Sequence, residues 1–177
     1  AGCANANVEK IVEKRIPTSF SEGFFCDTVV IVEGDTDKIV IETLSDKLGQ
    51  ALDSRGISVI EMSGKGGLKV PYSIFQELEI PAYVIVDGDA LGAARKYPQD
   101  ATKRASAHAS HQEATNDVLA WLPISSARHG TLPYAFGNQT VVTNHFTIWE
   151  DDVEEELAKW PSFITALTAN GSKLRSK

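Results

Sequence analysis

The sequence predicts an α/β fold with a parallel sheet flanked by helices, and three observations support this prediction. Two apolar runs of β-branched residues, 28–33 and 82–87, each stop abruptly at carboxylates and a glycine. A third apolar run, 57–62, lies between them, and segments with helical spacing separate the three runs. Short apolar runs are typical of strands buried on both faces. The β-α-β-α-β order requires right-handed crossovers with helices on the faces of a parallel sheet.

Each element follows from its local pattern. A weak helical pattern over residues 5–15 ends at Pro17, so residues 1–17 are expected to form an N-terminal helical extension. After the first strand, a helix is predicted from about Asp37 to Leu52, because apolar residues recur there at helical spacing. The residues with this spacing are Ile39, Val40, Thr43, Leu44, Leu48 and Leu52.

A glycine-rich turn, Ser63 to Gly67, precedes a second helix predicted over roughly 68–78. The turn lacks the GxxxxGK[ST] arrangement of a P-loop, which argues against ATP binding at this position. Its amides and Lys65 could contact a phosphate group at the helix N-terminus, or the segment could be a tight turn alone. The candidates for phosphate contact are Lys65, Gly66 and Gly67.

The second half of the chain is less regular. One or two mobile helices are predicted within residues 90–117, which are rich in Ala, Ser, Thr and His. A short hairpin is expected around Val141 and Val142, and one more strand at 146–149. A helix from Asp151 to Leu167 must break or restart at Pro161. His108 and His111 are not accompanied by cysteines at zinc spacing, so a solvated helix face is the expected setting.

Composition bounds the class of protein. The chain has 177 residues, of which 42% are hydrophobic and 23% charged, as in an ordinary soluble globular domain. No apolar stretch approaches the roughly 20 residues of a membrane span, so no membrane partner is expected. The two cysteines, Cys3 and Cys26, show no CxxC spacing. They predict a reducing compartment and a cytoplasmic protein, with neither a disulfide framework nor a zinc knuckle.

The net charge of −7 counts against tight DNA binding by this segment alone. A metal site, however, concentrates carboxylates, and bound cations cancel part of their charge. The basic residues are also unevenly spread, with a group near or after the strand ends: Lys65, Lys69, Arg95, Lys96, Lys103 and Arg104. The last residues, 171–177, contain no obvious capping element, which suggests that the segment belongs to a longer chain.

The candidate chemistry follows from the spacing of the acids. In an extended backbone Asp87 and Asp89 share one face with Cα atoms about 7 Å apart, and they could hold one cation or bridge two. Gly88 between them leaves the chain free to turn and lets a ligand approach. Glu33 ends a strand that could lie beside this one. Asp37 would lie about one helical turn beyond Glu33 and could reach the same metal cluster.

Each acidic motif also has an ordinary structural interpretation. A single DxD at a strand end is often a turn in which an Asp caps the next helix, and Asp35 and Asp37 can be capping residues that favour the helix dipole. The arrangement of the two motifs distinguishes the interpretations. Both follow buried strands within one βαβαβ unit, and this context favours a metal site.

Taken together, Val32-Glu33-Gly34, a glycine-rich turn and Asp87-Gly88-Asp89 resemble the TOPRIM domain of topoisomerases, primases and related nucleases. More narrowly, Phe24-Phe25 followed by residues 29–37 is similar to the start of the TOPRIM domain in OLD-family nucleases, with its VEG-D/E-x-E/D motif. The resemblance covers residues 18–90 and, more loosely, 145–177. It implies that Glu33, Asp87 and Asp89 bind Mg²⁺ or Mn²⁺ beside a DNA phosphate. It also implies an N-terminal ATPase and dimerisation region, so that ATP would act only through a domain absent from this chain.

OLD-family nucleases carry further acids after the DxD in a D-x-x-x-E pattern. The resemblance therefore implies Asp152 and Glu156 as metal ligands, with Asp151 and Glu155 as the alternative register. Acids four residues apart share one helix face, although an acidic run can also be a solvated helix start. The family also has a late lysine, for which Lys173 and Lys177 are the candidates. Asp37 stands where many relatives have Glu, and residues 90–145 offer little that aligns.

The expected function is that of a metal-dependent DNA endonuclease. Residues 18–177 would form the TOPRIM catalytic domain with an insertion at about 90–145. Glu33, Asp37, Asp87 and Asp89 would carry a two-metal hydrolysis of phosphodiesters. Two alternatives stay open: a primase or topoisomerase type of TOPRIM module, and a non-catalytic, receiver-like domain that binds Mg²⁺. Tyr72, Tyr83, Tyr97 and Tyr134 show no setting typical of a topoisomerase nucleophile.

Overall fold

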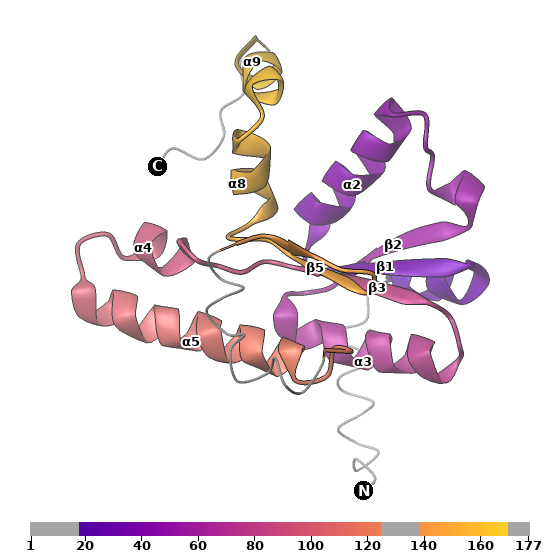
Figure 1. Cartoon of the computed structure of the whole chain (residues 1–177), viewed down its shortest axis with the longest axis horizontal. Coiled ribbons are helices and arrows are strands. Elements are labelled where there is room, and N and C mark those ends of the chain that lie inside the picture. The colour runs from indigo at the N-terminus through magenta and orange to yellow at the C-terminus, as the bar shows by residue number, and fades with distance from the viewer. Residues whose placement is uncertain (1–17, 125–138, 170–177) are drawn as a thin grey trace, which may run out of the picture. The chain divides into compact units, whose positions relative to one another are not determined.

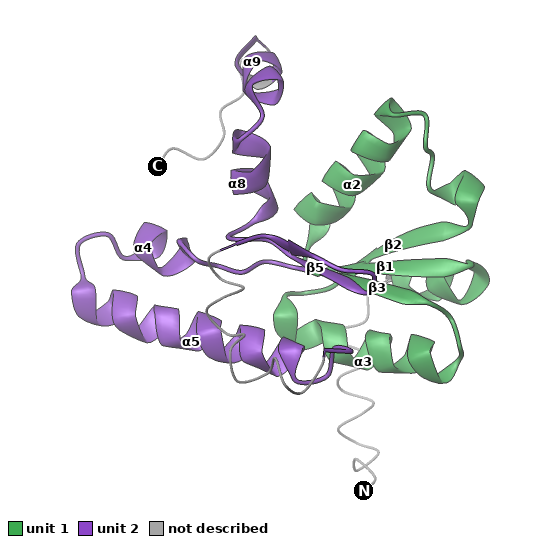
Figure 2. Cartoon of the chain, in the orientation of Figure 1, with its two compact units in different colours: residues 1–85 green, residues 86–177 purple. Residues whose placement is uncertain are grey.

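The computed structural model describes residues 18–124 and 139–169 (Figure 1). The chain forms two compact units, residues 1–85 and residues 86–177, which are coloured separately in Figure 2. The helical extension expected at residues 5–15 lies outside the described residues. No helix in the described ranges combines the length and apolar character needed to cross a membrane.

The first unit contains the parallel sheet that the sequence predicts. Strand β1 lies between β2 and β3 and is parallel to both, with Thr28 opposite Ile57 and Val29 opposite Ala82. Each strand ends one residue earlier than expected. The elements are the 3₁₀ helix η1 (Thr18–Phe25), β1 (Thr28–Val32), α2 (Asp35–Lys47), the 3₁₀ turn η2 (Asp53–Arg55), β2 (Ile57–Glu61), α3 (Lys65–Glu77) and β3 (Ala82–Val86).

The core of this unit explains why the apolar runs form strands. Val29 and Ile31 of β1 have no exposed surface. Helices α2 and α3 lie on opposite faces of the three strands (Figure 1), as right-handed crossovers in opposite directions require. On the α3 side, the rings of Phe20 and Phe24 pack on Phe75 with centroids 5.1 and 5.5 Å apart. This aromatic group fixes η1 against the sheet.

Helix α2 differs from the prediction in both length and burial. It begins at Asp35 and ends at Lys47, whereas a helix from Asp37 to Leu52 was expected. Gly49 ends it, because this residue adopts a left-handed conformation with φ of 67° and its N–H bonds back to the Asp46 carbonyl oxygen. The predicted apolar stripe is only partly buried, since Ile39 and Leu48 are 61% and 74% exposed.

The second unit has the elements expected of the less regular half of the chain. Two helices follow β3, β4 and β5 pair in antiparallel fashion, and Pro161 starts a new helix as predicted. Asp100 caps the longer helix by accepting a hydrogen bond from the Lys103 N–H at 2.9 Å. The elements are α4 (Gly92–Lys96), α5 (Ala101–Leu119), β4 (Val141–Val142), β5 (Phe146–Ile148), α8 (Val153–Ala158) and α9 (Pro161–Ala169).

The chain after β5 runs beside the turn that follows β3. The Trp149 N–H donates to the Val86 carbonyl oxygen at 2.9 Å, and the Asp89 N–H donates to the Asp151 carbonyl oxygen at 3.0 Å. These backbone bonds join two segments that lie about sixty residues apart in the sequence. They place the DGD motif and the acidic run at 150–156 in the same part of the second unit.

Candidate functional site

Glu33 and Asp37 flank the N-terminus of α2. Gly34 is the N-cap in an extended conformation, and a Cβ placed on it would meet no atom within 4 Å. Asp37 lies in the first turn and is only 6% exposed. The positive end of the helix dipole favours carboxylates at this position. Glu33 thus lies directly after the strand and Asp37 in the first turn of the helix. That the two acids share one metal cluster stays a prediction.

Lys65 lies next to Glu33 and is itself buried. Its Nζ is 4.0 Å from Glu33 Oε1, and its side chain is 7% exposed. Gly64 before it has φ of 81° and ψ of 176°, a combination that is essentially restricted to glycine and that ends the turn where α3 begins. The Lys65 ammonium therefore partly neutralises the carboxylate after β1. The contact of Lys65, Gly66 and Gly67 with DNA phosphate stays a prediction.

The strand arrangement behind the site prediction is present in the first unit. Strands β1 and β3 run in the same direction as direct neighbours, with Ile31 opposite Val84. Parallel neighbours present their carboxyl ends at one edge of the sheet. Glu33 is the first residue after β1, and Asp87 is the first residue after β3. In open α/β sheets this edge is where ligands bind.

The DGD turn in the second unit is more strongly bent than the extended strand end assumed from the spacing. Asp89 has φ of 55°, which is uncommon for a non-glycine residue, although aspartate tolerates it better than most. Gly88 has a different role from the one expected. A Cβ on Gly88 would lie 2.3 Å from the Trp149 carbonyl oxygen and 2.6 Å from that of Glu150. Its missing side chain therefore makes room for the protein backbone, which corrects the prediction that it admits a ligand.

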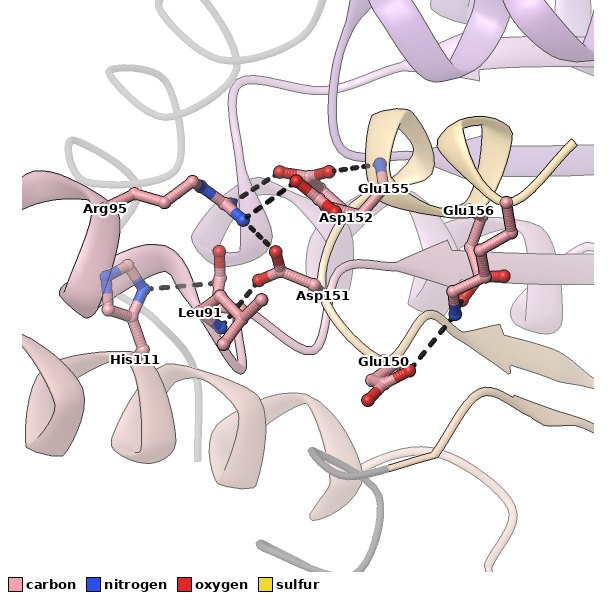
Figure 3. Close-up of polar contacts among 10 residues, drawn as sticks. Leu91, Arg95, His111, Glu150, Asp151, Asp152, Glu155 and Glu156 are labelled. Atoms are coloured by element: carbon pink, nitrogen blue, oxygen red, sulfur yellow. Dashed lines mark hydrogen bonds and ion pairs between the residues drawn. The ribbon is translucent and has the colours of Figure 1, made fainter. Parts of the chain in front are cut away.

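His111 of α5 contacts the second aspartate of the motif. Its Nδ1 is 3.2 Å from Asp89 Oδ2, and its side chain is 34% exposed (Figure 3). A Cβ on Gly92 would lie 3.4 Å from Asp89 Oδ1 and 3.7 Å from His111 Cε1, so the start of α4 packs closely on this pair. His111 thus lies on a partly solvated helix face and in addition contacts Asp89. The sequence did not predict this contact, because the two residues are twenty-two positions apart and leave no local pattern.

Arg95 of α4 is surrounded by three carboxylates of the acidic run (Figure 3). It donates to Asp151 Oδ2 and, at 2.6 Å, to Asp152 Oδ2, and Glu155 Oε1 lies 3.9 Å from its Nη1. Asp151 is 3% exposed and also accepts from the Leu91 N–H at 2.8 Å. Burial alone would lower the pKa of Arg95. The bond to Asp151 and the three negative charges outweigh burial and raise that pKa above its ordinary value.

Asp152 and Glu156 do not share a helix face, in contrast to the preferred register. Asp152 is the N-cap of α8, with an extended backbone and its Oδ1 accepting from the Glu155 N–H at 2.9 Å. The spacing argument fails because the helix starts only at Val153. Glu156 points away from Arg95 and pairs with Lys159 at 2.8 Å (Figure 3). Burial raises the pKa of Glu156, but hydrogen bonds from Lys159 and Thr140 outweigh it and lower that pKa below its ordinary value.

Asp151 and Glu155, the alternative register, both contact Arg95 together with Asp152. Sequence reasoning counted Arg95 only among the dispersed basic residues and missed this contact. The candidate lysines Lys173 and Lys177 lie outside the described residues.

The donor set suits a hard divalent cation, since it consists of carboxylate oxygens. The acids around Arg95 are already paired with one positive charge of the protein. Within residues 18–124 and 139–169, however, no three His, Cys, Asp or Glu side chains are grouped closely enough to hold a metal ion. The residues fit the expected metals by type, whereas a complete ligand set is not assembled in the described residues.

Comparison with known proteins finds a family match for the first part of this arrangement. Residues 24–89 match the model of the overcoming lysogenization defect protein-like TOPRIM domain. These 66 of the 177 residues are similar to an OLD-like TOPRIM domain, and we call them the TOPRIM segment. The match spans β1 to the DGD turn and therefore includes both acidic strand ends of the TOPRIM segment.

The TOPRIM segment also has curated relatives. The chain is 35% identical over 100 residues to the uncharacterized protein YbjD of Escherichia coli, covering 56% of this chain and 17% of that protein. It is 32% identical over 80 residues to the endonuclease GajA of Bacillus cereus, covering 45% of this chain and 11% of that protein. The chain thus spans less than a fifth of the length of these relatives.

Among solved structures, the C-terminal region of the Xanthomonas campestris pv. campestris OLD protein is similar to this chain. The identity is 20% and the TM-score 0.46, over 83% of this chain and 60% of that one.

Proposed function

We propose that this chain is the nuclease module of an OLD-family protein and hydrolyses DNA phosphodiesters with the help of Mg²⁺ or Mn²⁺. The observation that carries the proposal is the TOPRIM match over residues 24–89, which contains carboxylates directly after two adjacent parallel strands. The relative GajA is named an endonuclease, and this name supports the class of reaction. We also propose an ATPase region of the same protein as a partner of this chain. The chain covers only 17% of YbjD and 11% of GajA, so these relatives are much longer than the matched segment.

Glu33, Asp87 and Asp89 are the residues we assign to metal binding, with Asp37 as a further ligand at the start of α2. Divalent ions bound by these carboxylates would supply an activated water and would offset charge on the phosphate oxygens. The carboxylates themselves orient the cations and neutralise their charge. Lys65, buried beside Glu33, keeps that carboxylate in place through its ammonium group.

Asp151, Asp152 and Glu155 contact a cation of the protein, Arg95. We propose that Asp151 and Glu155, the register in which both acids face Arg95, take the role of the later acids of the family. Asp152 supports them by capping α8 and by fixing the guanidinium. Glu156 instead belongs to the separate group formed with Lys159 and Thr140.

The test is cleavage of supercoiled plasmid by the purified chain in Mg²⁺, Mn²⁺, Ca²⁺ or EDTA. The wild-type chain should nick or linearise the plasmid in Mg²⁺ or Mn²⁺ and be inactive in EDTA. Asp87→Asn, which keeps the size of the side chain and removes its charge, should lower cleavage at least a hundredfold with little change in melting temperature. Wild-type cutting by this variant would refute the assignment.

A matched control separates the site from general acidity. Asp46→Asn removes one exposed carboxylate from α2, and it should leave both cleavage and metal dependence unchanged. Cleavage by the wild-type chain only after addition of an ATPase region from the same protein would support the partner proposal. Equal loss of activity in Asp46→Asn and Asp87→Asn would argue against a defined metal site.

A further inference from the structure

The second unit carries a stripe of nitrogen-bearing side chains along α5 that the proposed function does not use. Arg104, His108 and His111 recur at spacings of four and three residues, so they lie on one face of the helix. The same spacing continues to Thr115 and Val118, which are both 2% exposed. The Thr115 and Val118 end of the stripe therefore lies where the helix packs, whereas Arg104, His108 and His111 are only half-buried and keep part of their surface accessible.

One end of this stripe reaches the DGD turn. His111 Nδ1 lies 3.2 Å from Asp89 Oδ2, so the third member of the stripe contacts a residue proposed to bind metal (Figure 3). Arg104 precedes His111 by seven residues, which is about 10 Å along the helix axis at 1.5 Å per residue. Arg104 and His111 could therefore contact different phosphates of one strand.

The charge around the stripe is opposite to that of the whole chain. Residues 92–112 contain four basic side chains, Arg95, Lys96, Lys103 and Arg104, and one acidic side chain, Asp100, in a chain of net charge −7. Arg95 is already neutralised by acids. Arg104 donates to the Pro98 carbonyl oxygen at 3.1 Å and forms no ion pair with a carboxylate of the described residues. Lys103 pairs with Asp100 at 3.3 Å and lowers the pKa of Asp100, with a smaller contribution from the charge of Arg104. Because Asp100 is already paired with Lys103, the Arg104 guanidinium can still bind an anion.

We propose that Arg104, His108 and the His111 end of α5 form a track for the phosphodiester backbone of the DNA strand that enters the TOPRIM site. The inference rests on the proposed function, because it places the cut phosphate near Asp89. Arg104 would contact a phosphate farther along the strand, and His108 would lie beside the backbone between Arg104 and His111. His111 orients Asp89 at the end of the track.

The test measures DNA binding apart from cleavage. A fluorescein-labelled duplex is titrated with the whole chain in EDTA, by anisotropy, between 50 and 300 mM salt. Arg104→Gln should weaken binding on the order of tenfold at 50 mM salt and lower the slope of log K against log salt by about 0.9, the value for one lost phosphate contact. Arg104→Lys keeps the charge and should retain the slope.

The matched control is Lys103→Gln. Lys103 lies one position away on the same helix, is 67% exposed and pairs with Asp100 Oδ2 at 3.3 Å. It should change affinity less than twofold. Equal effects of Lys103→Gln and Arg104→Gln would mean that only the general charge matters, and this result would overturn the track. An unchanged slope in Arg104→Gln would overturn it as well.

Two further outcomes separate this inference from the proposed function. If Asp87→Asn abolishes cleavage but Arg104→Gln binds like wild type, the nuclease stands and the track fails. If the chain never cleaves DNA but Arg104→Gln loses one unit of salt slope, the track is supported and the nuclease proposal fails. Tighter, Arg104-dependent binding to an RNA duplex of the same sequence would overturn DNA as the occupant.

Discussion

Arg95 in α4 donates a hydrogen bond to the carboxylate of Asp151, 56 residues later in the chain. Asp151 is almost fully buried, and the same carboxylate accepts from the backbone of Leu91. The pair therefore ties the segment after the DGD turn to the segment before α8. A buried ion pair of this kind adds little net stability by its presence, but loss of one partner leaves an uncompensated charge.

Replacing Arg95 with Met should lower the free energy of unfolding by about 2–4 kcal/mol, because Asp151 would stay buried without its counter-charge. Urea denaturation at pH 7 measures the change. Lys96→Met is the control, since Lys96 is the next residue and is exposed. Loss of less than about 1 kcal/mol in Arg95→Met would show that Asp151 finds another partner or water.

Replacing Gly88 with Ala should destabilise the chain by about 1–3 kcal/mol, because the added methyl group would overlap two backbone carbonyl oxygens. Gly34→Ala provides the comparison, since a Cβ there meets nothing within 4 Å and its extended φ suits any residue. That variant should cost under about 1 kcal/mol, the scale of a weaker N-cap. Thermal melting of both variants measures the difference in stability. Equal melting temperatures of Gly88→Ala and Gly34→Ala would contradict the crowding at Gly88.

His111→Ala should weaken Mn²⁺ binding by roughly 10- to 100-fold, the usual effect of removing a group that orients a ligand. Isothermal titration with Mn²⁺ gives this value without any cleavage assay. His111→Asn should recover part of the affinity, because its amide can still donate to Asp89. His145→Ala, an exposed histidine near β5, should bind as wild type does. Unchanged affinity in His111→Ala would remove His111 from the proposed site.

Glu61 should make stability depend on pH below its ordinary pKa. Burial raises the pKa of Glu61, but bonds from its own backbone N–H, Lys38 and Ser19 outweigh burial and lower the pKa below the ordinary value of 4.5. The unfolded chain therefore binds the proton more readily than the folded chain. The stabilisation is fully present above pH 4.5 and is lost as the pH falls through the folded pKa.

Comparison of the wild type with Glu61→Gln by urea denaturation between pH 3 and 7 tests this sign. The wild type should be more stable by about 0.5–1 kcal/mol at pH 7, and the difference should disappear toward pH 3. Glu42 serves as a control for which the opposite pH dependence is expected. Burial raises the pKa of Glu42 and outweighs the charge of Lys38, which would lower it. A wild-type advantage that grows as the pH falls would contradict the direction for Glu61.

The strands could be predicted to within one residue. Strands β1 and β3 are buried on both faces, and their residues, such as Ile31 and Val84, therefore form continuous apolar runs in the sequence. The extent of α2 could not be predicted from the apolar spacing alone. Leu48 and Leu52 continue the spacing, but Gly49 takes a left-handed conformation and stops the helix between them. The left-handed conformation of Gly49 thus ends the helix even though the apolar periodicity continues beyond it.

The places of Glu33 and Asp87 directly after β1 and β3 could be predicted to within one residue, because each apolar run stops at its acid. That these acids bind one metal cluster stays a prediction. The contacts of Asp89 and Asp151 could not be predicted. Their partners, His111 and Arg95, lie on helices whose position depends on packing within the second unit, and neither partner stands at a diagnostic spacing. Asp152 was assigned to the wrong geometry for a simpler reason, since an N-cap residue lies outside the helix that it starts.

Gly88 bears on how the DGD motif could be transferred between proteins. Gly88 lies so close to the carbonyl oxygens of Trp149 and Glu150 that the turn and the 149–151 segment depend on each other for their packing. A graft of Asp87-Gly88-Asp89 onto another parallel sheet would carry the carboxylates but not the backbone that shapes them. Such a chimaera should include both segments, and an insertion between them is best placed away from α4 and β5.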